Sequence, residues 1–307
     1  VKVDREERPD VDDIYMMATQ LMTGSGGWPM SVFLTPPGPP DENGEDDPGL
    51  KPFWAGTYIP PTPQHGRPGF PQVLDGLSGA WHEQRDEILQ QGDKLAEAVS
   101  EALVKQGEPG PVDASMVQAA TDQLLNMYDR EHGGFGNAPK FPQPAYLDFL
   151  LAVYENNPAD ALWQVIGHTL EKMARGGMYD QVGGGFHRYS TDERWLVPHF
   201  EKMLYDNAQL VELYVQAIEK KPADASAALY ERVVRESCDY VLREMTDPTG
   251  AFYSAQDAEV NAREGENYVW TEPQVREAIA DSALADLAVR MYGLDGGPNF
   301  QDPHAPD

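Results

Sequence analysis

The first hundred residues carry hydrophobic patterns that predict both helices and strands. After the turn at Arg8-Pro9-Asp10, a helix is indicated by apolar positions at spacings of three and four, namely Val11, Ile14, Tyr15, Ala18, Leu21 and Met22. The apolar runs Met30–Thr35 and Phe53–Ile59 predict buried strands, and Val1–Asp4 predicts the end of another. One long helix is predicted from Pro71 to Gln106. The segment therefore has an α/β pattern.

The rest of the chain changes to a helical pattern. A Gly- and Pro-rich linker is predicted at 107–112. After it, apolar periodicity predicts helices near 113–128, 143–156, 158–175, 199–220, 223–246, 272–281 and 283–292. Short connections alternate with long ones at 129–142, 176–198 and 247–271.

The three long connections carry related phrases, which are Gly133-Gly134-Phe135-Gly136, Gly184-Gly185-Phe186-His187 and Gly250-Ala251-Phe252-Tyr253. Recurrence of a helix pair with a decorated loop is typical of repeat architectures. Helical hairpins stacked in a ring place their long loops at one end, where functional residues concentrate. We therefore expect the chemistry of this part to lie in the long connections.

Charge excludes several classes of partner. The chain has 51 acidic and 23 basic residues, for a formal net charge of −28. This charge disfavours binding to nucleic acid or to an anionic membrane, and no apolar run approaches the ~20 residues that span a bilayer. The single Cys238 forms no internal disulfide, so nothing indicates an oxidising compartment. We expect a cytoplasmic protein in which Cys238 is a buried, unreactive thiol.

Neither end of the chain has the character of a natural terminus. The sequence opens at Val1 without a methionine, and it closes on a Pro- and Asp-rich run at 302–307. We expect an internal fragment of a longer protein.

Seven segments resemble one known family along nearly the whole chain. They are Val1-Lys2-Val3-Asp4-Arg5-Glu6-Glu7-Arg8-Pro9-Asp10, Gly24-Ser25-Gly26-Gly27-Trp28-Pro29, Phe53-Trp54-Ala55-Gly56-Thr57-Tyr58, Gly133–Pro142, Gly183–Ser190, Trp195–Ala208 and Phe252–Glu259. In this order they resemble the spermatogenesis-associated, thioredoxin-domain-containing family. Two features depart from the family pattern: its Cys-x-x-Cys-type motif would lie before Val1, and the acidic segment 38–50 has the character of an insertion.

The resemblance implies a fold class and a division into domains. The expected fold is an α/β thioredoxin-like fragment followed by part of an all-α, (α/α)6 toroid like those of six-hairpin glycosidases and sugar 2-epimerases. Residues 1–106 would be the thioredoxin-like domain without its N-terminal part, and 113–307 the toroid without its C-terminal part. Trp28 and Pro29 match the loop that holds a cis-proline in thioredoxin-like folds, which implies a cis bond and a face for a thiol-containing partner. Without the thiolate, this chain cannot itself start thiol–disulfide exchange.

The loop at 176–198 offers the groups that a sugar site needs. His187, Arg188, Tyr189 and Trp195 lie within nine residues of one another. Aromatic rings can stack on a pyranose, Arg188 can hold an oxygen ligand through its planar fork, and a histidine can transfer protons. The alternative is structural: the aromatics fill the ring, and His187 bonds to the backbone.

Pro198 begins the next predicted helix, since proline suits the first turn. His199, Lys202 and Asp206 then share one face, which makes His199 a candidate general acid or base at the mouth of the ring. Glu201 and Asp206 are candidate substrate-binding residues. A structural alternative is a helix cap with a Lys202–Asp206 ion pair.

Asp257 and Glu259 follow the third phrase, and Asp257 is the candidate for a second acid/base group. Alternation along the chain would point the two carboxylates to opposite faces, and solvated loop acids are the alternative. Lys140 is a candidate ligand for an anion or carboxylate. The seven histidines are scattered, and neither a phosphate loop nor a dinucleotide fingerprint is present, so no metal and no cofactor are expected.

Three functions fit these observations. The first is a carbohydrate-active enzyme, an epimerase or hydrolase, that uses His187, His199 and Asp257 as catalytic groups. The second is a redox or thiol-partner-binding protein that uses its thioredoxin-like face. The third is a non-catalytic scaffold, since fold alone does not determine function. Convergence of the three catalytic candidates in one place would favour the first.

Overall fold

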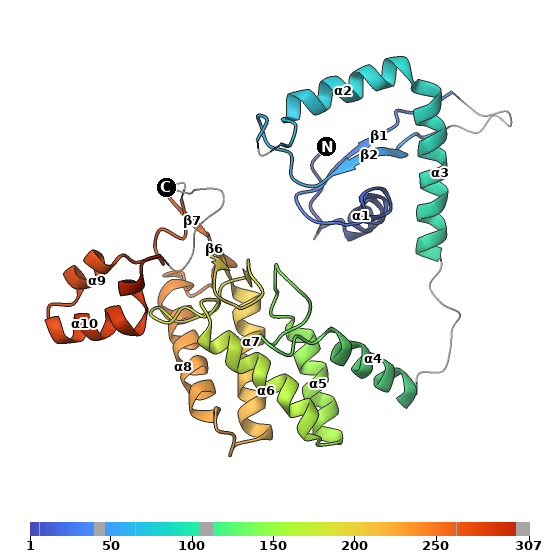
Figure 1. Cartoon of the computed structure of the whole chain (residues 1–307). Helices are drawn as coiled ribbons and strands as arrows, with labels where there is room; N and C mark the ends of the chain where they lie inside the picture. The colour runs from blue at the N-terminus through green and yellow to red at the C-terminus, as the bar shows by residue number, and fades with distance from the viewer. Residues whose placement is uncertain (6, 40–46, 65, 105–112, 262, 299–307) are drawn as a thin grey trace. The chain divides into compact units, whose positions relative to one another are not determined.

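The chain divides into two compact units, Val1–Pro111 and Val112–Asp307 (Figure 1). The structure is a computed structural model, and it describes residues 1–5, 7–39, 47–64, 66–104, 113–261 and 263–298. The linker predicted at 107–112 and most of the acidic segment 38–50 lie outside the described residues. Each unit is described by itself.

The first unit packs helices against a two-stranded antiparallel sheet. Helix α1 (Pro9–Thr23) begins with a proline and ends at Gly24 in the left-handed conformation. Strand β1 (Ser31–Leu34) pairs with β2 (Pro52–Gly56), with Val32 opposite Ala55. Helices α1 and α3 (Arg85–Val104) pack on β2 and on each other, while α2 (Phe70–Glu83) contributes the Phe53–Trp81 ring contact.

Two predictions for this unit are wrong. Val1–Asp4 is not a strand, because a strand end requires a paired neighbour and the described sheet consists of β1 and β2 alone. The long helix predicted at 71–106 is two helices, because the backbone leaves the helical conformation at Gln84 (φ −130°, ψ 30°). A new helix begins at Arg85 with Asp86 and Glu87 in its first turn, where the helix dipole favours acids. The predicted cis bond between Trp28 and Pro29 is present.

The second unit is helical, with short strands in its connections. Its helices are α4 (Ala114–Met127), α5 (Pro144–Asn156), α6 (Asp160–Arg175), α7 (Leu204–Lys220), α8 (Ala227–Glu244), α9 (Glu272–Ala278), α10 (Ser282–Met291) and the 3-10 turn Leu294–Gly296. The strand pairs are β3 (Tyr189–Ser190) with β4 (Pro198–His199), β5 (Lys202–Met203) with β6 (Ala255–Gln256), and β7 (Glu259–Val260) with β8 (Arg263–Glu264). The long connections gather at one end of the helices, as predicted (Figure 1).

The core of this unit lies between α5, α6, α7 and α8. Fully buried apolar side chains from these helices include Leu147, Leu150, Ile166, Leu170, Leu210, Tyr214 and Val233. The helix predicted from residue 199 begins only at Leu204, because Pro198–His199 and Lys202–Met203 pair with other segments as β4 and β5. Cys238 is exposed, not buried as expected, and Ser237 beside it is the residue that faces the interior.

The three long connections repeat one turn. In each turn an aspartate, Asp129, Asp180 or Asp247, accepts a hydrogen bond from the backbone N–H two residues later, at 2.8–3.0 Å. Each turn is closed by a bridge to the phenylalanine of the repeated phrase: Tyr128 to Phe135, Tyr179 to Phe186, and Thr246 to Phe252. The related phrases in the sequence therefore correspond to one repeated backbone structure.

Two of these turns are each closed by a buried lysine. Lys140 donates to the Asp129 carboxylate (2.6 Å) and to the Gly133 carbonyl (3.0 Å). Lys202 donates in the same way to Asp180 (2.8 Å) and to the Gly184 carbonyl (2.9 Å). In the third turn the Tyr253 hydroxyl donates to Asp247 instead (2.8 Å). These lysine-closed turns fix the loop end of the unit, because both ammonium groups are buried and paired.

Candidate active site

An arginine, a histidine and two carboxylates meet at the loop end, where Arg188 precedes β3, His199 lies on β4, Glu201 follows β4 and Glu264 lies on β8. Arg188 Nη1 lies 2.7 Å from Glu201 Oε2, and the Arg188 backbone N–H donates to the Glu201 carbonyl (2.8 Å). His199 Nδ1 donates to Glu264 Oε1 (2.7 Å), and its Nε2 lies 3.8 Å from Glu201 Oε2. We call Arg188, His199, Glu201 and Glu264 the His199 cluster. Since Glu264 fixes which nitrogen of His199 carries the proton in this bond, Nε2 is left for other partners.

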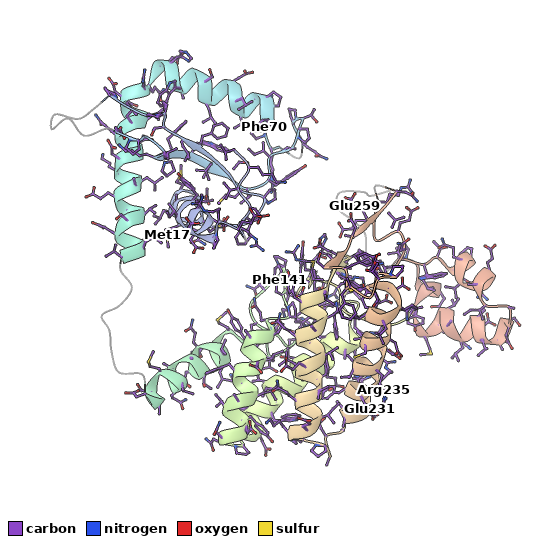
Figure 2. All side chains as sticks on the ribbon, turned by 180° about the vertical axis from the view of Figure 1, so that it is seen from behind. Met17, Phe70, Phe141, Glu231, Arg235 and Glu259 are labelled. Atoms are coloured by element: carbon purple, nitrogen blue, oxygen red, sulfur yellow. The ribbon has the colours of Figure 1, made fainter. Side chains whose placement is uncertain are left out.

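Three rings form a column beside this cluster. Tyr189 stacks on His199 with ring centroids 4.9 Å apart, and Phe141 stacks on Tyr189 at 4.7 Å. Phe141 keeps 39% of its surface exposed. Figure 2 shows Phe141 and Glu259 at the loop end of the helical unit. Glu231 and Arg235, which lie on α8, are far from this end. The column therefore offers an aromatic surface next to His199.

Asp206 lies in the first turn of α7, close enough to Arg188 and Glu201 for both to affect its titration. Its side chain is buried, and its Oδ2 has no hydrogen-bond partner among the described residues. Burial raises the pKa of Asp206 to about 7, because the ionised form loses hydration; Arg188 opposes this shift and Glu201 adds to it. This carboxyl group can therefore carry a proton near neutral pH, which is required of a general acid.

His187 lies deeper and plays a different part. It is buried, its Nδ1 donates to the Phe200 carbonyl (3.0 Å), and its ring meets the Tyr268 ring edge-on at 4.7 Å. Burial, followed by repulsion from Lys202, lowers the pKa of His187 to about 3. The imidazole is thus neutral at pH 7 and bonded to the backbone, as the structural alternative held.

Two residues predicted to bind substrate are enclosed by the protein. Trp195 has no exposed surface, and its Nε1–H donates to the His132 carbonyl (3.0 Å). The Lys140 ammonium lies 5.5 Å from the centre of the Trp195 ring and closes the first turn. Neither side chain offers a free surface to a ligand, so we correct both assignments to structural roles.

Strand pairing also separates residues that the helical prediction had placed on one face. His199 lies on β4, Lys202 on β5 and Asp206 on α7. Lys202 pairs with Asp180 and not with Asp206, so the predicted Lys202–Asp206 pair is wrong.

The third connection supplies a carboxylate that the sequence analysis missed. Asp257 and Glu259 are exposed, and Asp257 accepts a hydrogen bond from the Glu259 backbone N–H (3.0 Å). The carboxylate that reaches His199 is Glu264, five residues beyond Glu259 and opposite it in the β7–β8 hairpin. The sequence feature that could have indicated this hairpin is Gly265, the glycine directly after Glu264. Gly265 has φ +75°, and a Cβ there would lie 2.5 Å from the Phe200 ring.

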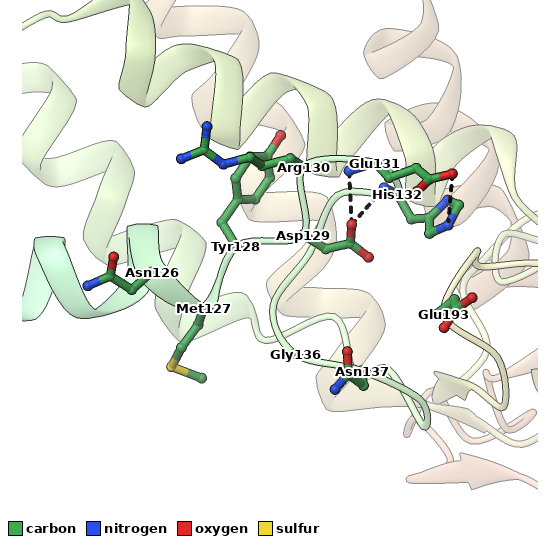
Figure 3. A pocket seen from close by; sticks show the side chains of 10 residues that line it. All are labelled: Asn126, Met127, Tyr128, Asp129, Arg130, Glu131, His132, Gly136, Asn137 and Glu193. Carbon is green, nitrogen blue, oxygen red and sulfur yellow. Dashed lines mark hydrogen bonds and ion pairs between the residues drawn. The ribbon is translucent and has the colours of Figure 1, made fainter.

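Two cavities lie elsewhere in this unit. The larger, about 560 Å³, is lined by Asn126–His132, Gly136, Asn137 and Glu193 (Figure 3). Inside it the Asp129 carboxylate is occupied by the backbone N–H groups of Glu131 and His132 and by Lys140. The smaller, about 270 Å³, adjoins Lys202. Within the described ranges, no set of three His, Cys, Asp or Glu side chains is arranged to hold a metal, and no helix is long and apolar enough to cross a membrane.

The Trp28 ring lies exposed in the first unit. Its Nε1–H donates to the Asp12 carboxylate (3.0 Å), and the Arg5 guanidinium lies 4.1 Å from the ring centre. Trp28 and Pro29 thus form part of the surface of the thioredoxin-like unit, on the loop that the family resemblance matches to a cis-proline loop.

Similarity to known proteins shows the family to which the chain belongs. Residues 1–100 match the family model Thioredox_DsbH, described as "Protein of unknown function, DUF255". Spermatogenesis-associated protein 20 of Homo sapiens is 38% identical over 99% of this chain, and its counterpart in Mus musculus is equally similar. The chain belongs to the family of spermatogenesis-associated protein 20. It spans about 40% of the length of these two family members. An uncharacterized protein of Caenorhabditis elegans is 34% identical over 99% of the chain and 42% of its own length.

Solved structures of sugar epimerases are similar to part of the chain. Cellobiose 2-epimerase from Spirochaeta thermophila aligns with a TM-score of 0.39 and 20% identity, covering 47% of this chain and 39% of its own. The enzyme from Bacillus thermoamylovorans aligns with a TM-score of 0.40 and 12% identity, covering 62% and 56%. Likeness at this level says nothing about activity. The predicted order of a thioredoxin-like part followed by a helical part is confirmed, and the closure of the helical part into a toroid stays a prediction.

Proposed function

We propose that the helical unit is the catalytic part of a carbohydrate-active enzyme, an epimerase or hydrolase, in which His199 transfers the proton. The observation that carries the proposal is the bond between His199 Nδ1 and Glu264 Oε1 at 2.7 Å. A carboxylate in this position orients the imidazole and fixes its tautomer. His199 Nε2 is then available to take a proton from substrate.

The groups around His199 fit a sugar better than an apolar ligand. The Arg188–Glu201 pair offers both donors and acceptors to hydroxyl groups, and Phe141 offers an aromatic face. Asp206, with its pKa of about 7, would be the second proton-transferring group, because Arg188 and Glu201 both lie close enough to affect its titration. Either reaction needs two such groups: an epimerase removes and returns a proton at one carbon, and a hydrolase protonates the leaving oxygen while a base activates water.

Substitutions in the full-length protein test the proposal. Purified protein is incubated with a panel of reducing mono- and disaccharides in D2O. Epimerisation would exchange a carbon-bound hydrogen for deuterium, and hydrolysis would release a new reducing end. We expect His199→Ala and Glu264→Gln to lower kcat by about a hundredfold or more, the usual contribution of a positioned acid or base.

Matched variants separate this assignment from the alternatives. Glu259→Gln removes an exposed carboxylate opposite Glu264 in the same hairpin and should leave kcat within about twofold. Asp257→Asn tests the sequence-based assignment directly, since a large loss there would restore Asp257 as the second acid/base. Full activity of His199→Ala, or no turnover of any sugar by the wild-type protein, would exclude the proposed role.

A further inference from the structure

The smaller cavity of the helical unit is a second candidate site, separate from the His199 cluster. It holds about 270 Å³ between the end of α8, the second Asp turn and the segment that follows β8. We infer that it binds one neutral, hydroxylated ring, such as a single pyranose unit of a carbohydrate. The inference rests on the walls of this cavity and not on the chemistry proposed for His199.

The charged groups that line the cavity are already paired. Lys202 is 1% exposed and donates to Asp180 and to the Gly184 carbonyl. Arg243 donates to Glu244 (2.8 Å) and to the Gly183 carbonyl (2.7 Å). An anionic ligand would have to displace one of these carboxylates from its cation, whereas a neutral ligand leaves both pairs intact. The cavity therefore favours a neutral ligand.

Three aromatic residues supply the apolar walls. The Lys202 ammonium lies 4.2 Å from the centre of the Tyr240 ring and 4.9 Å from that of Tyr268, which fixes both rings in place. Trp270 also lines the cavity and keeps 47% of its surface exposed. Rigid aromatic faces of this kind pack against the C–H surface of a sugar ring.

Amide groups supply the open hydrogen-bonding positions. Gln256 Oε1 accepts a hydrogen bond from the Tyr240 hydroxyl (2.7 Å), and this bond orients the side-chain amide of Gln256. The two N–H donors of this amide have no partner among the described residues. Within the same residues, the side-chain amide of Asn267 and the Trp270 indole N–H also make no hydrogen bond. Neutral donors and acceptors beside aromatic faces match a ligand that carries several hydroxyl groups.

The cavity and the His199 cluster share a wall. The Tyr268 ring that lines the cavity meets His187 at 4.7 Å and stacks on Phe200 at 5.6 Å. Phe200 in turn donates its backbone N–H to Glu264 Oε1 (3.2 Å). Ring packing therefore separates the two places, so a substitution at His199 need not change the cavity.

The test measures binding of methyl β-D-glucopyranoside and methyl α-D-mannopyranoside to the full-length protein by saturation-transfer NMR and titration. Glucuronate and glucose 6-phosphate serve as anionic probes of similar size. We expect at least one neutral glycoside to bind, and both Trp270→Ala and Asn267→Ala to weaken its binding by about tenfold or more. Trp270→Phe, which keeps an aromatic face, should retain most of the affinity.

Two control variants decide where the ligand binds. Trp28→Ala removes an exposed tryptophan of the thioredoxin-like unit and should leave the affinity unchanged. His199→Ala should also leave it unchanged, even if it abolishes turnover. The inference is overturned if neither neutral probe binds, if Trp270→Ala binds as well as wild type, if the anionic probes bind more tightly, or if His199→Ala abolishes binding. The last outcome would assign the ligand to the His199 cluster.

Discussion

Asp206 shows how a single residue links stability to chemistry. One of its oxygens is buried without a hydrogen-bond partner among the described residues, an arrangement that destabilises the ionised form. The site proposed for proton transfer would tolerate this cost, because a carboxyl group that holds a proton near pH 7 is useful there. Arg188 and Glu201 lie close enough to shift the pKa of Asp206 in opposite directions: Arg188 lowers it and Glu201 raises it.

The raised pKa makes a prediction about stability and pH. Below about pH 3, Asp206 is protonated in both the folded and the unfolded chain and costs nothing. As pH rises from about 4 to 7, only the unfolded chain ionises, so the free energy of unfolding falls. Asp206→Asn has no such loss, so at pH 8 it should be about 2–4 kcal/mol more stable than wild type.

Urea unfolding of both proteins at pH 4.5 and pH 8 measures this difference. The gain from Asp206→Asn should be much smaller at pH 4.5 than at pH 8. Asp239→Asn, which removes an exposed carboxylate on α8, is the control and should show no pH-dependent gain. Equal stability of Asp206→Asn and wild type at pH 8 would contradict the buried, protonated carboxyl.

The repeated turn is the main feature at the scale of elements. The turns at Asp129 and Asp180 place a glycine with positive φ against an aromatic ring. A Cβ on Gly134 would lie 2.5 Å from Trp195, and one on Gly185 would lie 2.5 Å from Tyr240. Each of these rings also faces the lysine that closes the turn. The turn is therefore a packed unit of aspartate, glycine, lysine and aromatic ring, and it holds the loops that carry the His199 cluster.

The buried lysine should matter far more than a surface one. Lys140→Met leaves Asp129 without its cation in a largely enclosed turn and should cost about 3 kcal/mol or more of unfolding free energy. Lys220→Met removes a lysine that pairs with the exposed Glu155, and should cost at most about 1 kcal/mol. Chemical denaturation of the two variants compares these costs. Similar losses in both would show that the Lys140–Asp129 pair adds little to stability.

At the scale of the whole molecule, the helical unit is uneven in its packing. Helices α5 to α8 share a continuous core, whereas α10 keeps Leu284, Leu287 and Met291 exposed. Helix α10 therefore has less buried apolar surface than α5 to α8 to oppose local opening. In repeat-like arrays, a terminal hairpin with an uncovered apolar face loses stability first.

Hydrogen exchange should therefore differ between the two ends of the unit. We expect the amides of 272–292 in this chain to exchange at least tenfold faster than those of α7, because opening α9 and α10 exposes little new apolar surface. Exchange followed by mass spectrometry gives the protection of each segment. Equal protection of 272–292 and of 204–220 would contradict this expectation.

The sequence by itself determined the elements whose pattern is local. Apolar spacing placed the helices of the second unit to within a few residues, apart from the start of α7, and the repeated Gly-aromatic phrases marked the three turns. Both depend on contacts between residues only a few positions apart, such as the bond from Asp129 to the N–H of Glu131. The family resemblance added the fold class and the cis bond before Pro29.

Only the tertiary structure decided which polar groups meet. Glu264 reaches His199 across 65 residues of sequence, and Lys202 reaches Asp180 across 22. No local pattern encodes such pairings, because they join residues of different connections that meet only in the folded chain. The same packing buries His187, Lys140 and Trp195, which their chemistry and their places in the long connections had marked as candidates. Burial and long-range pairing are properties of the folded chain, and they determine which of the candidate residues can meet a substrate.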